Sequence, residues 1–435
     1  MAGIAQKAFS LYVVLTFLSI PIIGLAMGDG GVFGKYGSVF QLEQNSQIGV
    51  INHDNGYQKM IISINFDWED STNTAWIFPI PSAPQYVNVD LAGGVPTIDG
   101  EDVMQEAKED ITGSFWLFGF SYMESIFLPL PVGLSINDFF YGLAPGSGGI
   151  DVHMRLEKYG MTVQVITATD GTAIFDYLAN NGLEITQGLV PQLDDYVGRN
   201  YSFVVTWISG SQAYVREPGV IVGFPTEEAY YPLMLTSIYG NSVIPMGIVV
   251  KGHVSPRIYD YIEPYADVKY MRGSGYIPMM DATPEVEDFA DDMEEGWDGT
   301  FTTINITAPS SAFTEDIWIE KKIPQKVKNA LAIDSLFGEG HTLALAFALT
   351  LTVAPLLSFA VGFGLLGLKW EYLTIFSFMA IMNILGLLGL ILGAIILNAY
   401  FKIPGKKAVA YALLCSLSFV AIVLSIYGAC YLIYL

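Results

Sequence analysis

Acidic side chains are the residues of this sequence whose type and spacing could do chemistry. Nine acids lie in the eighteen-residue stretch Asp281–Asp298. Carboxylate oxygens suit Ca²⁺, and within this stretch the calcium candidates are Asp288, Asp291, Asp292 and Glu295. The Asp-x-Asp-x-Asp-Gly spacing of a calcium loop is absent, so a solvated or partner-binding acidic helix is the alternative. We therefore predict no required cofactor and name calcium as the one metal to test.

Histidine and cysteine form no recognisable catalytic or zinc motif. The histidines are His53, His153, His253 and His341. None has a second histidine or cysteine two to four residues away, as zinc motifs do. Both cysteines, Cys415 and Cys430, are near the C-terminus, so residues 29–340 have neither a thiol nor a disulfide. Gly-x-Ser-x-Gly and His-Glu-x-x-His are also absent. A site assembled by the fold stays open as an alternative.

Two asparagines match the acceptor pattern for N-glycosylation. Asn200 begins Asn-Tyr-Ser and Asn305 begins Asn-Ile-Thr. The pattern has meaning only if this part of the chain is exported. We therefore predict Asn200 and Asn305 as conditional modification sites.

Charge limits the class of partner. The formal net charge is −23, and all of the acids except Glu371 precede residue 341. A field of this sign repels nucleic acid and attracts cations or basic proteins. We therefore exclude nucleic acid as a partner and expect other membrane or surface proteins, with solubility alone as the alternative reason for the acidity.

The elements that must position these groups are mostly strands. Asn55-Gly56 between Gln47–Ile51 and Lys59–Phe66 predicts a hairpin. Ala75–Pro81 contains two prolines and is typical of an edge segment. Further strands are predicted at 150–156, 161–168, 201–208, 220–224, 233–238, 244–250 and 300–308. Residues 97–112 predict an exposed acidic helix, and two short helices are predicted at 171–180 and 189–198. The expected fold is α+β, with a mostly antiparallel β ectodomain and two short helices.

The last part of the chain is apolar. Three runs, 342–368, 372–401 and 408–435, each exceed the roughly 20 residues that cross a bilayer, and charges are confined to the breaks between them. They predict an all-α bundle of three transmembrane helices. Lys7 followed by an apolar run to Ala26 predicts a signal peptide or an uncleaved anchor. We therefore expect a multi-pass protein of the cell membrane, with membrane lipid as a partner and a large extracytoplasmic domain, although the lysines favour the reverse topology.

Composition divides the chain into five expected segments. They are a signal peptide or N-terminal membrane anchor at 1–26, a β-rich first part of the ectodomain at 27–148, an α+β second part at 149–272, an acidic membrane-proximal segment at 273–340 and the three-helix transmembrane region at 341–435.

Several motifs resemble one family. Thr74–Ser82 resembles a signature in which an Ala-Trp pair is followed by alternating aliphatic residues and prolines. Further matches occur within Val163–Val204 and at Tyr231–Ser237. These look like the exported domain-of-unknown-function family 2330, over roughly residues 28–255. The chain departs from that family by lacking cysteines near the mature start and by an insertion-like Phe115–Leu134. The resemblance implies export and often C-terminal membrane helices, but no activity and no site.

The function that follows from these observations is binding. We expect a membrane-anchored, exported, acidic ectodomain that acts as a non-enzymatic surface-binding protein or as a component of a membrane complex. One alternative is an accessory subunit of a transporter or membrane enzyme. The other is an envelope hydrolase with a fold-assembled site.

Overall fold

The fold is that of a computed structural model, which describes residues 31–33, 46–65, 74–124, 155–183, 189–208, 218–277, 283–337, 386–400 and 402–434. The chain forms two compact units. Unit 1 comprises residues 1–99, 151–268 and 274–321, and unit 2 comprises 100–150, 269–273 and 322–435. Each unit is described by itself. The predicted segment 1–26 and the run 342–368 lie outside the described residues, and so does Phe115–Leu134 beyond Glu124.

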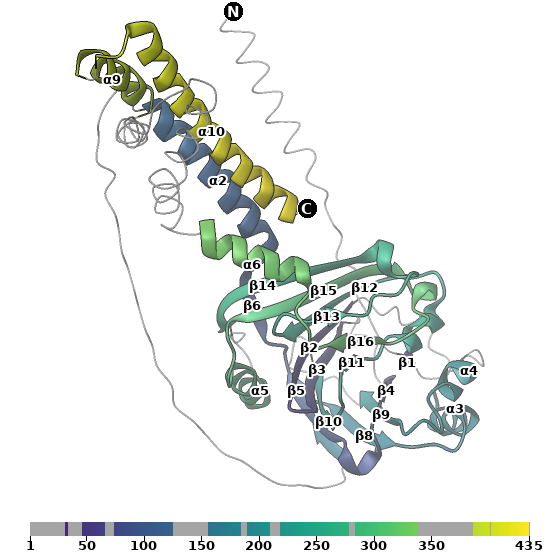
Figure 1. The fold of residues 1–435 in the computed structure, drawn as a ribbon. Coiled ribbons are helices and arrows are strands. Elements are labelled where there is room, and N and C mark those ends of the chain that lie inside the picture. Colours follow the sequence, from purple (N-terminus) through teal and green to yellow (C-terminus); the bar gives the residue numbers. More distant parts are fainter. Residues whose placement is uncertain are drawn as a thin grey trace, which may run out of the picture. The chain divides into compact units, whose positions relative to one another are not determined.

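Among the described residues before 341, strands in three sheets make up the larger part of the regular structure (Figure 1). The strands are β1 (Gly31–Phe33), β2 (Ser46–Asp54), β3 (Tyr57–Asn65), β4 (Thr74–Ile80), β5 (Asn88–Gly93), β6 (Thr97–Asp102), β7 (Arg155–Lys158), β8 (Met161–Ile166), β9 (Ser202–Ile208), β10 (Pro218–Pro225), β11 (Ala229–Tyr231), β12 (Val243–Lys251), β13 (Ser255–Pro256), β14 (Ala266–Ile277), β15 (Thr300–Pro309) and β16 (Ile317–Glu320). The α-helices are α2 (Val103–Glu124), α3 (Gly171–Asn180), α4 (Leu189–Asp194), α5 (Pro284–Glu294), α6 (Gln325–Phe337), α9 (Gly386–Ala399) and α10 (Gly405–Tyr434). The 3-10 turns are η2 (Pro84–Tyr86), η3 (Met234–Tyr239), η4 (Glu263–Tyr265) and η5 (Ser310–Ala312).

The largest sheet has eight strands in the order β5-β10-β3-β2-β12-β15-β14-β6. Its predicted hairpin is confirmed: β2 and β3 pair antiparallel, and the turn residues Asn55 and Gly56 have φ of 50° and 76°. Both values are positive, as a tight two-residue turn requires. One contact is parallel, between β2 and β12, with Gln47 opposite Met246. This pairing joins the hairpin to strands that come much later in the chain.

The second sheet has the order β1-β4-β9-β8-β7. The prediction of an edge position for Ala75–Pro81 is wrong, because β4 lies between β1 and β9. Proline is tolerated here because β1 is short. Its register with β4 ends at Ala75–Ile77, so Pro79 pairs only with Phe203 of β9.

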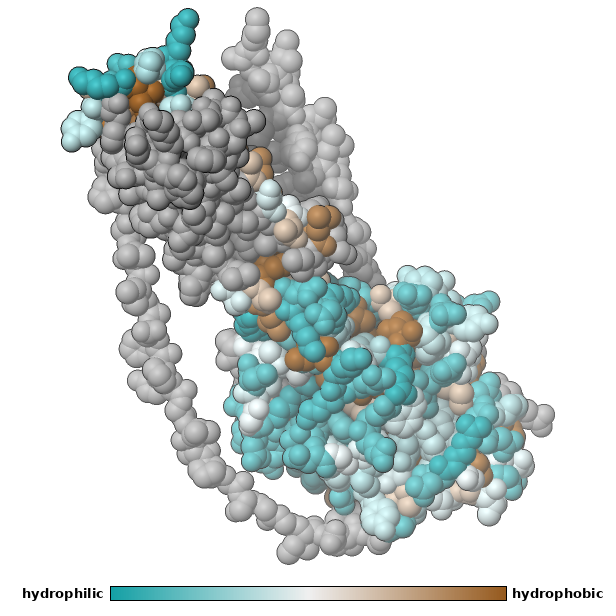
Figure 2. Space-filling view, in the orientation of Figure 1, coloured by the Kyte–Doolittle hydropathy of each residue, from teal (hydrophilic) through white to brown (hydrophobic). Residues whose placement is uncertain are grey.

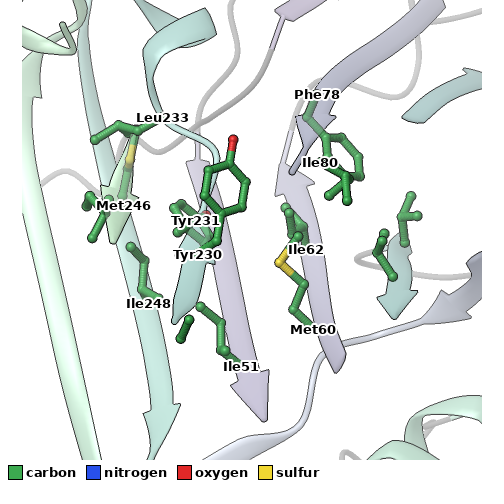
Figure 3. Close-up of a cluster of buried hydrophobic side chains, with 14 of the residues drawn as sticks. Ile51, Met60, Ile62, Phe78, Ile80, Tyr230, Tyr231, Leu233, Met246 and Ile248 are labelled. Carbon is green, nitrogen blue, oxygen red and sulfur yellow. The ribbon is translucent and has the colours of Figure 1, made fainter. Parts of the chain in front are cut away.

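The main core of unit 1 lies between the strands. Figure 3 shows Ile51 of β2, Met60 and Ile62 of β3, Phe78 and Ile80 of β4, Tyr230 and Tyr231 of β11, and Met246 and Ile248 of β12 turned toward a shared space. Alternate residues of β12 are buried, which is the period expected of a strand with one face on a core. Burial of these apolar side chains is the main stabilising contribution to the fold.

Helices cover parts of the sheets. The acidic helix that was the alternative to a calcium site at Asp281–Asp298 is present as α5, whose apolar face (Val286, Phe289, Ala290 and Met293) packs on residues of the large sheet that include Ile61. The predicted helix at 171–180 is confirmed as α3. Asp170 caps its N-terminus by accepting a hydrogen bond from Ala173, and Gly182 ends it with φ 87°. Helices α3 and α4 bury Ile174, Leu178 and Leu193 against β4 and β9.

A charged cluster connects β5, β7 and α5. The Lys158 ammonium lies 2.7 Å from an oxygen of Asp90 and 3.0 Å from one of Glu285. The Tyr159 hydroxyl donates to the other Glu285 oxygen at 2.7 Å. Tyr159 has φ 54°, which is uncommon for a bulky residue. We infer that the bond to Glu285 offsets part of the cost of this backbone conformation.

Unit 2 contains α2, α6, α9 and α10. Its described core packs α2 on α6 through Val103, Ala107 and Ile111 of α2 and Ala330 and Ile333 of α6. Arg272 lies 2.8 Å from a carboxylate oxygen of Asp334 and 3.8 Å from one of Glu106. The prediction of one helix over 97–112 is wrong in its first part, because 97–102 form β6.

The predicted bundle of three transmembrane helices is wrong. Within the described ranges, no helix has both the length and the apolar run that a bilayer crossing requires. Of the second predicted span the structure describes only the part that contains α9, Gly386–Ala399, and of the third the part that contains α10.

Two wider expectations change with that result. The predicted localisation as a multi-pass protein of the cell membrane is wrong, as is the description as a transmembrane protein. The fold class is corrected to a mostly β-sheet structure with five α-helices, rather than two, among the described residues before 341. Residues 233–238 were also predicted as a strand, but form η3, because a short apolar run does not distinguish the two.

Candidate functional site

A cavity in unit 1 lies beside strand β16 and has a volume of about 320 Å³. It is lined by Asp195, Tyr196, Arg199, Tyr201, Met234, Thr314, Glu315, Asp316 and Trp318. We call it the Asp316 cavity. Its volume is at the lower end of the range for small-ligand pockets, about 300–1,000 Å³.

The carboxylate of Asp316 is held by four donors of its own chain. Its Oδ1 accepts hydrogen bonds from the backbone N–H groups of Leu233 at 2.7 Å and Met234 at 2.9 Å. The same oxygen accepts the Tyr196 hydroxyl at 2.9 Å, and Oδ2 accepts the Tyr230 hydroxyl at 2.8 Å. Asp316 therefore links the end of α4, strand β11 and the start of η3.

Strand β16 positions both Asp316 and Trp318. Ile317 and Ile319 are buried and alternate with the more exposed Trp318, which is the period of a half-buried strand. The antiparallel pairing of β11 with β16 places Tyr230 directly opposite Trp318. Asp316 immediately precedes β16, so the strand fixes where its carboxylate lies.

The turn after α4 positions the tyrosines. Tyr196 is 3% exposed, and its backbone N–H donates to Leu193 at 3.1 Å, continuing the helical turn. Gly198 and Asn200 then have φ of 81° and 63°, and the chain continues into β9. This reversal places Tyr201 close to Tyr196.

The aromatic rings form a continuous series. Ring centroids are 5.1 Å apart for Tyr196 and Tyr201, 6.2 Å for Tyr201 and Tyr230, and 4.9 Å for Tyr230 and Trp318. These separations lie in the range of favourable aromatic pairs. Because each ring contacts the next, we expect the cavity wall to be rigid.

Negative charge predominates at the cavity. Asp195, Glu315 and Asp316 face one cation, Arg199, whose nearest oxygen on Asp195 is 3.8 Å away. Burial raises the pKa of the Asp316 carboxyl, although the four hydrogen bonds oppose this shift. Burial and then the charge of Asp316 raise the pKa of the Tyr201 hydroxyl to about 12, so Tyr201 is neutral at pH 7.

This arrangement is suited to binding. The oxygens of Asp316 accept hydrogen bonds from the chain itself, so the carboxylate is poorly placed to take a proton from a substrate. The lining contains no histidine, cysteine or lysine, and its only hydroxyls belong to threonine and tyrosine. Rigid aromatic walls with a few fixed polar groups are typical of a pocket that recognises a ligand.

The predicted calcium candidates are on the exposed side of α5 and just beyond it. The Asp292 carboxylate pairs with the Lys59 ammonium, and the Glu295 carbonyl accepts the Lys251 ammonium at 2.6 Å. Asp288 and Asp291 are exposed. No group of three or more side chains suited to a metal is found in the part of the chain that the structure describes. Calcium stays a prediction, and these acids lie outside the Asp316 cavity.

The two predicted glycosylation sites are both exposed. Asn200 is in the turn before β9, and Asn305 is on the outward face of β15 opposite Gly247 of β12. Their accessibility fits modification, which itself stays a prediction.

Sequence reasoning missed the Asp316 cavity. No strand was predicted at 317–320, although Ile317-Trp318-Ile319 alternates as a strand does. Tyr196 lies within Val163–Val204, a range that the sequence singles out only for the family resemblance. The partners of Asp316 are 82 to 120 residues away in the chain, at a distance that no local motif encodes.

Comparison with known proteins gives no family. No family model matches the chain, and no curated protein matches it. A chain of the crystal structure of the caspase-8/P35 complex is similar at 9% identity and TM-score 0.26, with 63% of this chain and 96% of that chain covered. Baculovirus P35 is similar at 8% identity and TM-score 0.24, with 65% and 98% covered. At these scores neither similarity supports an argument about fold or function.

Proposed function

We propose that this is a non-enzymatic binding protein whose acidic, β-rich unit 1 takes a small ligand in the Asp316 cavity. The observation that carries the proposal is the carboxylate of Asp316, held by four hydrogen bonds at a cavity with aromatic walls. The four hydrogen bonds hold this carboxyl group in one position, so it is a fixed polar group in an aromatic lining, as small-ligand pockets have.

The character of the surface supports binding of positively charged partners. Figure 2 shows mostly hydrophilic residues over the sheets of unit 1 in that view. The chain carries 43 acidic against 20 basic residues, so its field favours the approach of cations and basic proteins. Membership of the exported family of unknown function 2330 is part of the proposal and is supported by the sequence of β4, Thr74–Ile80. It adds no activity.

A fragment screen tests the proposal. The full chain is screened by ligand-observed NMR against fragments of matched size in anionic, neutral and cationic sets. We expect one set to give hits that disappear in Trp318→Ala, because this change removes one wall of the cavity. The matched control is Tyr261→Ala, since Tyr261 is 68% exposed and lies outside the lining. It should keep all hits. Absence of any Trp318-dependent hit in all three sets would overturn the proposal.

A further inference from the structure

We infer that the Asp316 cavity recognises a small organic cation bearing an alkylated ammonium group. This inference rests on the function proposed above and names the class of ligand. Three features of the described residues support it: the aromatic residues of the lining, the excess of acidic over basic residues there, and the hydrogen bonds that the Asp316 carboxylate already accepts.

Aromatic residues from three separate parts of the chain line the cavity. Tyr196 comes from the turn after α4, Tyr201 from the start of β9 and Trp318 from β16. Cations are attracted to aromatic faces within about 6 Å of the ring centroid, and tryptophan is the strongest partner. Met234 also lines the cavity, and its thioether can contact N-methyl groups.

The charges favour a cation over an anion. Arg199 is the only basic residue of the lining, and its side chain is 69% exposed. Its ion pair with Asp195 is therefore surrounded by solvent and is weak. Glu315 and Asp316 remain to attract a positive group, while an anionic ligand would meet like charge.

The hydrogen bonds of Asp316 distinguish between classes of cation. A primary ammonium or guanidinium group requires acceptors for several N–H donors. Oδ1 of Asp316 already accepts three hydrogen bonds, from Leu233, Met234 and the Tyr196 hydroxyl, and Oδ2 accepts one, from the Tyr230 hydroxyl, so little acceptor capacity is left on this carboxylate. An alkylated ammonium group needs no acceptor and gains from charge and ring faces alone.

The size of the cavity favours a small molecule. A volume of about 320 Å³ is at the lower end of the range for small-molecule pockets and accommodates a compact cation. Choline is therefore a suitable probe. Its neutral isostere 3,3-dimethyl-1-butanol has the same shape without the charge, and 3,3-dimethylbutanoate supplies the opposite charge.

Isothermal titration of the full chain with these three probes tests the inference. We expect choline to bind about tenfold more tightly than the neutral isostere, and the carboxylate not to bind. Trp318→Leu keeps an apolar side chain and should weaken choline binding about tenfold. Glu315→Gln, an exposed and structurally tolerant change, should weaken it about twofold, and added salt should reduce that difference. Tyr261→Leu should leave binding unchanged.

The outcomes separate this inference from the proposed function. Equal binding of choline and its isostere, or tighter binding of the carboxylate, would contradict the inference while Trp318-dependent binding still supported a ligand site. No binding of any probe or fragment would overturn both. A peptide carrying trimethyl-lysine that bound more tightly than choline would contradict the assignment to a small molecule.

Discussion

Asp316 shows how one side chain organises a site. It follows no motif, yet it accepts hydrogen bonds from two backbone N–H groups and two tyrosine hydroxyls. These four donors are surrounded by protein atoms, and without Asp316 they would need other hydrogen-bond acceptors there. The same carboxylate is available to the cavity as a fixed negative charge.

Replacement of Asp316 tests this double role. Asp316→Ala leaves the N–H groups of Leu233 and Met234 without their acceptor and should lower the free energy of unfolding by about 3 kcal/mol. Asp316→Asn keeps one oxygen acceptor and should lower it less. Urea denaturation of the two variants measures the difference. Equal, small losses for both variants would show that the hydrogen bonds contribute little.

The sequence predicts local features at the residue scale and misses non-local ones. Asn55-Gly56 predicts its turn because both residues adopt positive φ readily, and the structure confirms it. Asp170 and Gly182 bound α3 for similarly local reasons. Asp316 has no such signal, because its partners Tyr196 and Tyr230 reach it only through the tertiary fold.

At the scale of elements, close packing of α3 on α4 depends on a glycine. A Cβ atom at Gly171 would lie 2.7 Å from the carbonyl oxygen of Val190 and 3.1 Å from Cβ of Leu193. The structure therefore has no room for alanine at the first residue of α3.

Substitution of two glycines by alanine should give opposite signs. Gly171→Ala forces α3 from α4 and should destabilise unit 1 by about 1–3 kcal/mol. Gly113→Ala in α2 meets nothing within 4 Å and should stabilise its helix by up to about 1 kcal/mol. Chemical denaturation followed by circular dichroism measures both. If Gly171→Ala left the free energy of unfolding unchanged, α3 and α4 could separate without cost.

The cluster connecting β5, β7 and α5 should make unit 1 sensitive to acid. Burial raises the pKa of the Glu285 carboxyl, but hydrogen bonds from Tyr159, its own backbone N–H, Lys158 and Thr283 outweigh this and lower it to about 2. Since the folded pKa lies below the unfolded value of 4.5, the stabilisation is present above about pH 4.5 and is lost as the pH falls toward 2.

Glu285→Gln should remove this dependence. At pH 7 the variant should lose up to about 3 kcal/mol of the free energy of unfolding, and the gap from the wild type should narrow between pH 4.5 and 2. Urea denaturation at a series of pH values measures it. Tyr159→Phe, which removes one hydrogen bond, should show the same trend with a smaller amplitude. A gap that does not change with pH would contradict the assignment.

Element type was predictable where a pattern was long and failed where it was short. The acidic stretch around α5 combines apolar residues at helical spacing with exposed acids, and the helix was predicted correctly. The exposure of residues 97–102 alternates along β6, but their sequence, Thr-Ile-Asp-Gly-Glu-Asp, has only one apolar residue, and its acids suggested a helix.

At the scale of the whole molecule, the two units should respond to pH in opposite directions. In unit 2, burial and then a hydrogen bond with Glu101 raise the pKa of the Glu106 carboxyl to about 7, while Arg272 opposes the shift. Since the folded pKa lies above the unfolded value of 4.5, the stabilisation is fully present below about pH 4.5 and is lost as the pH rises through about 7.

Hydrogen exchange measures this in each unit separately. After correction for the intrinsic effect of pH, protection of α2 should fall between pH 5 and 8 in the wild type and should be nearly constant in Glu106→Gln. Protection of β2 and β3 in unit 1 should not fall over the same range, because the pKa of Glu285 lies well below it. A parallel fall in both units would contradict the separate assignments.

The parallel contact between β2 and β12 has a consequence for biosynthesis. On the ribosome, the early hairpin emerges well before the strands that flank it on both sides, β10 and β12. The hydrophobic edges of the hairpin therefore stay unpaired until β10 and β12 have been synthesised. Non-local pairing of this kind slows folding. A nascent chain that stops short of Val243–Lys251 would expose those edges to aggregation or to a chaperone.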